Sequence, residues 1–427
     1  SVYFDSELNI SDWKINNQKI GDANITSSLD TELECIYIML QSNLEKDNQT
    51  ISPLTISGKF FPLKDNDNID FDVNFDGFSL KSLEPFLSSF SSRFEGDLHG
   101  QFALKGTVKQ PQITGSTMID KGVLKVDYSN TSYFFNDSII IDNQNIIFDN
   151  FEIKDEKNNI AYINGNIYQQ FLKNFKFDIR LNTDNLLIFN TTQSTNLPFY
   201  GTIYAKANVS VSGTDKNIII EVDSKTNNNS NINIPLNDKK TLTAQNFIQF
   251  AVKDSIRKEN ISFFDRNKKE TNENTSNKTN YKLTLNVEAT PDIRVSLPMD
   301  FSSIKALVTA TGNGDLQMSL NSDNPFAIMG DYKINNGLFK IDFVNLIEKE
   351  LKLENGSSLS WTGNPANASI NIKGIYEARV SLSSLTGTSS GMDNISGKTV
   401  NVESIISLSG NLSQPKIGLT IGFPCSL

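Results

Sequence analysis

Residues that could carry chemistry are few in this sequence and do not cluster. His99 is the only histidine and has no cysteine nearby, which argues against a zinc site and favours an exposed strand residue. No serine lies in a Gly-x-Ser-x-Gly motif, and no Gly-x-x-x-x-Gly-Lys-Ser/Thr loop occurs. The acidic stretch Asp65–Asp70 lacks the glycine and distant glutamate of a calcium loop and predicts a solvated turn. We therefore expect no catalysis, no cofactor and no metal.

Composition narrows the possible partners. The formal net charge of -10 and the pI near 4.9 argue against binding to nucleic acid, which requires a basic surface. No apolar run is long enough for a membrane-spanning helix. Residues Ser1–Asp5 show neither an initiator methionine nor a signal peptide and already alternate like a strand, so we expect a piece of a longer protein. Cys35 is expected to be a buried thiol, and the sequence leaves open whether it pairs with Cys425.

Strands are predicted along most of the chain, because polar and apolar residues alternate with a period of two. The clearest examples are Phe71–Phe75, Phe175–Leu181 and Lys282–Glu288. Turn-forming residues recur between such segments, and we interpret Lys121-Gly122, Asn335–Gly337 and Gly410-Asn411 as hairpin turns. The fold class indicated is all-β, with strand in at least half of the chain.

Helical spacing of apolar residues is limited to residues 83–94 and 244–257, which predict short helices lying against a sheet. Phe343–Leu353 is compatible with a helical turn or a bent strand. Residues 258–280 are rich in Asn, Lys, Glu and Thr and predict a mobile loop, and residues 383–397 form another polar insertion.

One spaced motif occurs twice. The first copy is Pro111, Ile113, Gly115, Ile119, Gly122, Leu124 and Val126; the second is Pro325, Ile328, Gly330, Ile334, Gly337, Phe339 and Ile341. From the first glycine onward every spacing is identical. One structural unit used twice is expected of an elongated β protein built from repeats. The glycines are expected at turns or bulges.

The apolar face of the predicted strands has two possible roles. The sequence contains 28 phenylalanines, most of them alternating with Ile, Leu or Val. They would pack against a second sheet about 10 Å away in a sandwich. Alternatively, a long curled sheet leaves this face open for an apolar ligand, and an acyl chain would gain roughly 0.8 kcal/mol for each methylene transferred from water. The candidates for this face are Phe71, Val73, Phe75, Phe175, Phe177, Ile179, Leu283, Leu285, Val287, Leu316, Met318, Leu320, Ile370 and Ile372.

An ordered series of motifs in the C-terminal part resembles a known family. The series is Leu283–Asp292, Gly312–Leu316, Gly330–Phe339, Gly356–Pro365 and Leu408–Ile417. It is similar to the C-terminal domain of TamB-like translocation and assembly module proteins of Gram-negative bacteria, in the wider AsmA-like group. Residues 96–126 and 161–190 resemble the hairpin repeats that precede this domain in Bacteroidota members. The motif residues expected to be structural are Gly115, Gly122, Gly330, Gly337, Gly356, Trp361, Pro365, Gly410 and Pro415.

The resemblance implies a β-taco, an elongated rolled sheet with an apolar groove, anchored in the inner membrane by an N-terminal helix absent from this chain and crossing the periplasm. It implies phospholipids and a TamA-type outer-membrane barrel protein as partners. The expected division is a β-rich fragment start at 1–77, hairpin repeats at 78–240, a helix with a mobile polar loop at 241–281, and a truncated C-terminal domain at 282–427.

The sequence is compatible with three functions. A lipid bridge would use the groove to carry phospholipids from the inner to the outer membrane. An assembly scaffold would use a free sheet edge to hold an incoming strand. An adhesin or spacer would close its apolar face completely.

Overall fold

The computed structural model describes residues 4–46, 48–88, 90–170, 173–193, 199–237, 280–301, 304–321, 326–343, 347–381, 399–412 and 414–423. The chain forms two compact units, unit 1 made mainly of residues up to Leu187 and unit 2 mainly of residues from Leu283 onward. The predicted helix at 244–257, the loop at 258–279, the insertion at 383–397 and Cys425 lie outside the described residues. The four-part division expected from the sequence remains a proposal.

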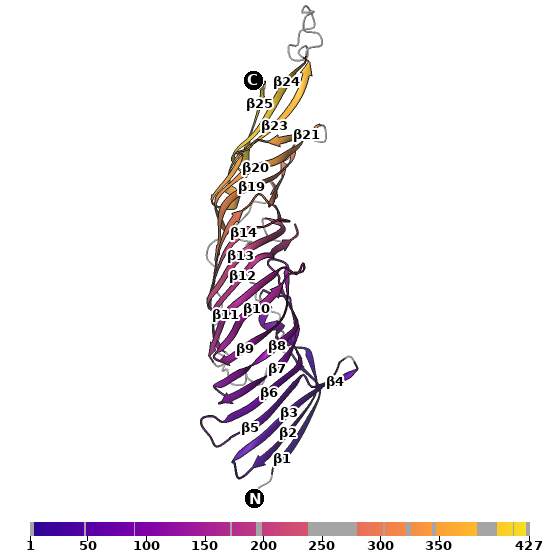
Figure 1. Ribbon diagram of the computed structural model, residues 1–427, viewed down its shortest axis with the longest axis vertical. Helices are drawn as coiled ribbons and strands as arrows, with labels where there is room; N and C mark the ends of the chain where they lie inside the picture. The colour runs from indigo at the N-terminus through magenta and orange to yellow at the C-terminus, as the bar shows by residue number, and fades with distance from the viewer. Residues whose placement is uncertain are drawn as a thin grey trace, which may run out of the picture. The chain divides into compact units, whose positions relative to one another are not determined.

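Strands of unit 1 follow one another along the chain and pair antiparallel with their neighbours in sequence, apart from the short β4 at the end of β3 (Figure 1). They are β1 (Asp5–Ile15), β2 (Gln18–Asp30), β3 (Cys35–Lys46), β4 (Gln49–Ile51), β5 (Leu54–Phe60), β6 (Ile69–Ser79), β7 (Arg93–Gly106), β8 (Pro111–Val126), β9 (Thr131–Asn143), β10 (Asn145–Lys154), β11 (Ile160–Gln170) and β12 (Lys173–Thr191). The strands β13 (Tyr200–Thr214) and β14 (Asn217–Thr226) follow.

Unit 2 combines antiparallel strands with short parallel pairs, in which β15 and β16 pair with β18. Its strands are β15 (Asn231–Asn233), β16 (Leu236–Asn237), β17 (Asn280–Ala289), β18 (Arg294–Phe301), β19 (Ile304–Asn321), β20 (Ala327–Phe343), β21 (Ile347–Leu353), β22 (Ser358–Gly363), β23 (Ser369–Ser381), β24 (Thr399–Asn411) and β25 (Gln414–Gly422). The predicted all-β fold is confirmed, and the three clearest predicted strands are parts of β6, β12 and β17.

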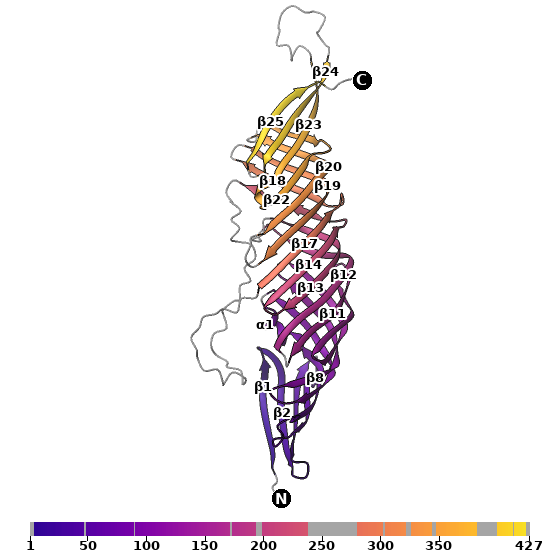
Figure 2. The same ribbon diagram turned by 90° about the vertical axis from the view of Figure 1, so that its left-hand side faces the viewer.

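Helical structure in the described part is limited to three short elements. The 3-10 turn η1 (Leu80–Leu83) leads into α1 (Glu84–Leu87), which is labelled in Figure 2. This helix packs against β7. A second 3-10 turn is η3 (Pro365–Asn367). The helix predicted at 83–94 is therefore real but short, since its last residue, Phe94, already belongs to β7. Of the apolar segment Phe343–Leu353, Phe343 ends β20 and Ile347–Leu353 form strand β21, while residues 344–346 lie outside the described residues.

The described residues of both copies of the repeated motif lie on a single long strand, β8 or β20, which contains a β-bulge; Pro325 lies outside the described residues. In β8 the register shifts between Ile119 and Gly122, and Lys121 has φ of 52°. In β20 the register shifts after Ile334 in the same way. The prediction of hairpin turns at Lys121-Gly122 and Asn335–Gly337 is therefore wrong, because an extra residue inside a strand uses the same left-handed or glycine conformations as a turn. The third predicted turn is confirmed, since β24 and β25 meet at Asn411.

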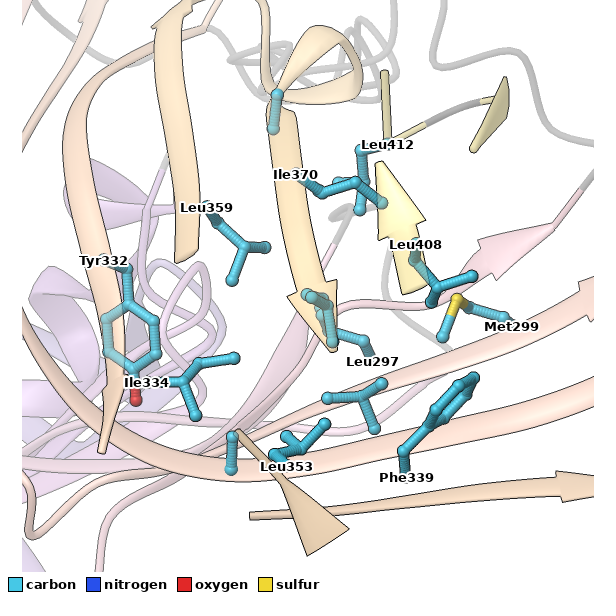
Figure 3. Packing of buried hydrophobic residues seen from close by; sticks show 14 of the residues in the cluster. Leu297, Met299, Tyr332, Ile334, Phe339, Leu353, Leu359, Ile370, Leu408 and Leu412 are labelled. Atoms are coloured by element: carbon cyan, nitrogen blue, oxygen red, sulfur yellow. The ribbon is translucent and has the colours of Figure 1, made fainter. Parts of the chain in front are cut away.

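Unit 2 encloses a compact hydrophobic core. Side chains from β18 through β24 converge on it, and Figure 3 shows how they gather. Fully buried members are Leu297, Val308, Ile334, Phe339, Ile341, Leu351, Leu359, Ile372 and Leu412. Because these strands carry apolar residues on alternate positions, one face of each strand supplies the whole core.

Candidate functional site

A continuous row of apolar side chains crosses the sheet of unit 1. Successive cross-strand partners define it, one from each of β1, β2, β3 and β5 to β12. The row is Leu8, Ile25, Leu40, Ile56, Val73, Phe102, Gly115, Ile141, Ile146, Ile167 and Phe177. Direct partners in a sheet point to the same face, so these residues share what we call the inner face. With strands about 4.8 Å apart, the row extends for roughly 50 Å along the sheet.

The inner face is apolar but incompletely covered. Within the described part of the chain, Ile25, Val73 and Phe177 are half-buried, and Leu8 is 55% exposed. Phe102 is buried because the ring of Phe75 packs edge-on against it, with ring centroids 5.7 Å apart. This partial exposure extends over most of the row, whereas a closed core would bury such residues almost completely.

The opposite face of the same strands carries charged and polar side chains, together with exposed apolar ones such as Met39, Met118 and Ile140. Lys105 and Asp70 form an ion pair there, with Nζ 3.4 Å from Oδ1. His99 also lies on this face, exposed as predicted, with Nδ1 3.1 Å from Oδ1 of Asp76. Exposed pairs of this kind add little stability. Their charges make this face more polar than the inner face.

The sheet of unit 1 curls so strongly that β9 touches β12. The hydroxyl of Tyr133 in β9 donates to the carbonyl of Leu187 in β12 at 3.0 Å, and the N–H of Leu187 donates to the carboxylate of Asp155 at 2.9 Å. In a flat sheet the three intervening spacings would hold β9 and β12 roughly 14 Å apart. Tyr133 is the inner-face partner of Leu124, so this contact crosses the inner side and makes it concave. Burial there raises the pKa of Tyr133.

The structure places the predicted candidates of unit 1 together on the inner face. Val73 and Phe177 belong to the apolar row, and Phe71, Phe75 and Ile179 stand beside it, all half-buried. Phe175 is half-buried on the same strand as Phe177. Sequence reasoning missed the rest of the row, including Ile25, Leu40, Ile56, Ile141, Ile146 and Ile167. Their period-two alternation, as in Ile36, Ile38 and Leu40, was the signal that would have found them.

The candidates in unit 2 divide into two groups. Leu283, Leu285, Val287, Leu316 and Met318 are half-buried, and the last two pack against the margin of the core. Leu320, Ile370 and Ile372 are buried to 5%, 3% and 1% exposure, and both isoleucines belong to the core cluster. In this chain these three side chains contact protein rather than an open face.

The motif residues have local structural roles. A Cβ at Gly115 or Gly330 would lie 2.2 or 2.1 Å from a backbone oxygen of the neighbouring strand, so both glycines allow close strand approach. Gly356 and Gly410 have φ of 92° and 89°, in the left-handed half of conformational space. Trp361 donates its indole N–H to the carbonyl of Pro365 at 3.3 Å, and Pro415 lies on β25 opposite Gly410.

Groups suited to catalysis are not brought together in the described residues, where no His, Cys, Asp and Glu cluster could hold a metal ion. Cys35 is buried, as expected, and its pairing with Cys425 stays a prediction. A search of the described helices finds none with the length and hydropathy needed to cross a bilayer. What the geometry offers is a concave apolar surface on a curled sheet.

The described part of unit 1 thus defines an all-β protein with a curled sheet and a long apolar inner face. The family model of the TamB C-terminal domain matches residues 144–426, about two thirds of the chain, and the chain therefore belongs to the TamB family. A comparison with curated proteins finds no match. TamB-family proteins are non-enzymatic, span the periplasm of Gram-negative envelopes, and act with TamA-type partners in translocation and assembly or in lipid transport.

Proposed function

We propose that this chain is part of a periplasmic bridge that carries phospholipids from the inner to the outer membrane along the inner face of unit 1. The parent protein is anchored in the inner membrane by a segment that precedes this chain and reaches a TamA-type barrel in the outer membrane. The chain itself performs no chemistry on the lipid. It contributes to outer-membrane biogenesis by providing an apolar surface along which phospholipids move.

The observation that carries the proposal is the half-buried apolar row from Leu8 to Phe177. Its length of roughly 50 Å exceeds what one acyl chain needs, so several positions of similar affinity succeed one another from strand to strand. Each methylene that leaves water for such a face gains about 0.8 kcal/mol. Because neighbouring positions on the row are chemically alike, a lipid can move along it without a large change in free energy.

The polar headgroup of a phospholipid is accommodated without burial. The curl at Tyr133 and Leu187 makes the inner side concave, while charged residues such as Lys105 and Asp70 stay on the wet outer face. A headgroup at the open side of the curled sheet remains hydrated, which avoids the cost of desolvating its charges. Only the acyl chains need the inner face.

The experiment that tests the proposal is native mass spectrometry with lipid extraction on the chain purified from a Gram-negative periplasm. Phospholipid at more than one copy per chain is the expected result, because the row offers several successive positions. A folded, lipid-free chain that also takes up no phospholipid from added vesicles would overturn the lipid function.

A second candidate function is a scaffold that helps insert or secrete outer-membrane proteins with a TamA-type barrel. One observation favours it. Within the described part, β25 pairs with β24 only, and its alternate residues Ile417, Leu419 and Ile421, with Phe423 directly after the strand, are each at least 50% exposed. An amphipathic strand with an unpaired edge can accept another strand through backbone hydrogen bonds. The scaffold would tolerate charges on the inner face of unit 1, whereas the lipid bridge would not.

A further inference from the structure

A phenylalanine ring lies over a glycine near the contact between Tyr133 and Leu187. Gly122 in β8 and Phe135 in β9 are direct cross-strand partners on the inner face. A Cβ on Gly122 would lie 2.1 Å from Cε2 and 2.2 Å from Cδ2 of the Phe135 ring. The ring therefore occupies the space that any side chain at position 122 would need. It extends sideways over β8 instead of standing away from the sheet.

The closest neighbour of a side chain at position 122 is the ring of Phe135. The three atoms nearest to a Cβ built there, Cε2, Cδ2 and Cζ, all belong to Phe135. At Gly115 the nearest atom is instead the backbone oxygen of Gln101, at 2.2 Å, which cannot move without distorting the strand pair. A methyl group at position 122 thus conflicts mainly with a side chain that can change rotamer.

Gly122 and Phe135 lie beside the contact that crosses the inner side. Two residues along β8, Leu124 is the partner of Tyr133, whose hydroxyl crosses the inner side to Leu187. The inner side is therefore narrowed next to the ring of Phe135. That ring is half-buried and packs against Phe151 of β10 with ring centroids 5.6 Å apart. A ring turned upright here would stand in the concavity.

We propose that Gly122 sets the depth of the lipid path at this constriction, by letting the ring of Phe135 lie against β8 so that acyl chains pass over it. The inference rests on the proposed lipid function and assigns a residue that determines which chains pass. The second copy of the motif differs in its surroundings. A Cβ at Gly337 would lie 2.6 Å from the backbone oxygen of Thr309 and 2.7 Å from Cδ1 of Leu353, which is part of the closed core of unit 2.

The test places a diazirine amino acid at Leu124, beside the constriction, or at Val73, farther along the inner face. The purified chain is incubated with vesicles of phosphatidylethanolamine and phosphatidylglycerol that contain acyl-labelled phosphatidylethanolamine, and lipid crosslinking is measured. Gly122→Ala is expected to lower labelling at position 124 by about fivefold or more, since overpacking displaces the ring, while labelling at position 73 stays within about twofold. Adding Phe135→Leu to Gly122→Ala should restore labelling at position 124, because the smaller side chain leaves room for the methyl group.

The outcomes separate the inference from the function on which it rests. Equal labelling at position 124 in the wild type and in Gly122→Ala overturns the inference while the lipid function stands. An unlabelled wild type at both positions overturns the lipid function, and the inference with it. Thermal unfolding checks that each variant folds. If Gly122→Ala does not fold, Phe135→Trp replaces it, because the larger ring exceeds the space over Gly122 and should lower labelling at position 124 in the same way; unchanged labelling overturns the inference.

Discussion

A negative charge on the inner face of unit 1 should weaken lipid binding around it without unfolding the chain. Val73 is the most informative position, because it lies in the apolar row between Ile56 and Phe102 and is half-buried. Val73→Asp replaces a lipid-facing apolar side chain with a carboxylate. Asn74→Asp is the matched control: it adds the same charge one residue along β6, on the polar outer face.

The expected magnitudes follow from the burial of Val73. Complete burial of a valine side chain contributes about 1.5–3 kcal/mol, so a half-buried valine should cost roughly 1 kcal/mol of stability when replaced. An acyl chain that contacts an unpaired polar group loses about 1–3 kcal/mol, which lowers its affinity roughly 5- to 100-fold at that strand. Asn74→Asp changes neither contact, so its lipid content should stay within about twofold of the wild type.

Native mass spectrometry of the two variants and the wild type, purified in parallel, measures the effect. The reasoning is refuted if Val73→Asp retains as much phospholipid as Asn74→Asp while both remain folded by circular dichroism. Retained function in outer-membrane protein assembly, combined with lost lipid in Val73→Asp, would assign the assembly role to other surfaces, such as β25.

Three further predictions concern stability. Gly330→Ala should destabilise the chain by about 1–3 kcal/mol in urea unfolding, because Gly330 has φ of 124° and the new Cβ would lie 2.1 Å from a backbone oxygen. The control Gly422→Ala places its Cβ in open space and should have little effect on stability. Tyr133→Phe should cost about 1 kcal/mol through its lost hydrogen bond to Leu187. Burial raises the folded-state pKa of Tyr133. The stabilisation that its protonated hydroxyl contributes is therefore complete below the unfolded pKa of about 10 and is lost as the pH rises toward the folded-state pKa. Tyr133→Phe should accordingly lose less stability than the wild type at alkaline pH. Hydrogen bonds from Lys14 and Lys19 lower the pKa of Asp12, so Asp12 stabilises the chain above an unfolded pKa of about 3.9, and Asp12→Asn should flatten the acid limb of the stability profile.

Each of these has a result that would contradict it. Equal urea midpoints for Gly330→Ala and Gly422→Ala would mean that β19 and β20 separate easily. An unchanged alkaline limb in Tyr133→Phe would mean that its hydroxyl is hydrated. An unchanged acid limb in Asp12→Asn would assign acid sensitivity to other carboxylates.

The strands could be predicted from the sequence because their signal is local. Alternation at Phe71–Phe75 and at Phe175–Leu181 reports directly on a strand with one wet and one apolar face, and β6 and β12 follow it. The same locality explains the errors. Lys121 with Gly122 offers the left-handed conformation and the missing side chain of a turn, but the strand continues to Val126 because β7 and β9 pair with it on both sides.

The helical segment at 83–94 shows the limit of periodicity. Pro85 lies in the first turn of α1, and the helix ends after Leu87 although apolar spacing continues to Phe94. Phe94 pairs with Leu124 in the sheet instead. Strand pairing with residues distant in sequence overrode the local helical preference. Such pairing cannot be predicted from the periodicity of one segment alone.

The difference between the two units could not be predicted, and it bears on the function. Val73 and Ile372 occupy equivalent alternating patterns, yet Val73 is half-buried whereas Ile372 is enclosed by a core that includes Phe339 and Leu408. Enclosure depends on how far the sheet curls and on which strands meet across it. If the apolar face served folding alone, the described part of unit 1 would bury it as unit 2 does, since an apolar side chain left partly exposed forgoes part of the roughly 1.5–3 kcal/mol that complete burial contributes. The partial exposure of apolar side chains along successive strands of the inner face therefore supports the proposal that an apolar ligand covers this face.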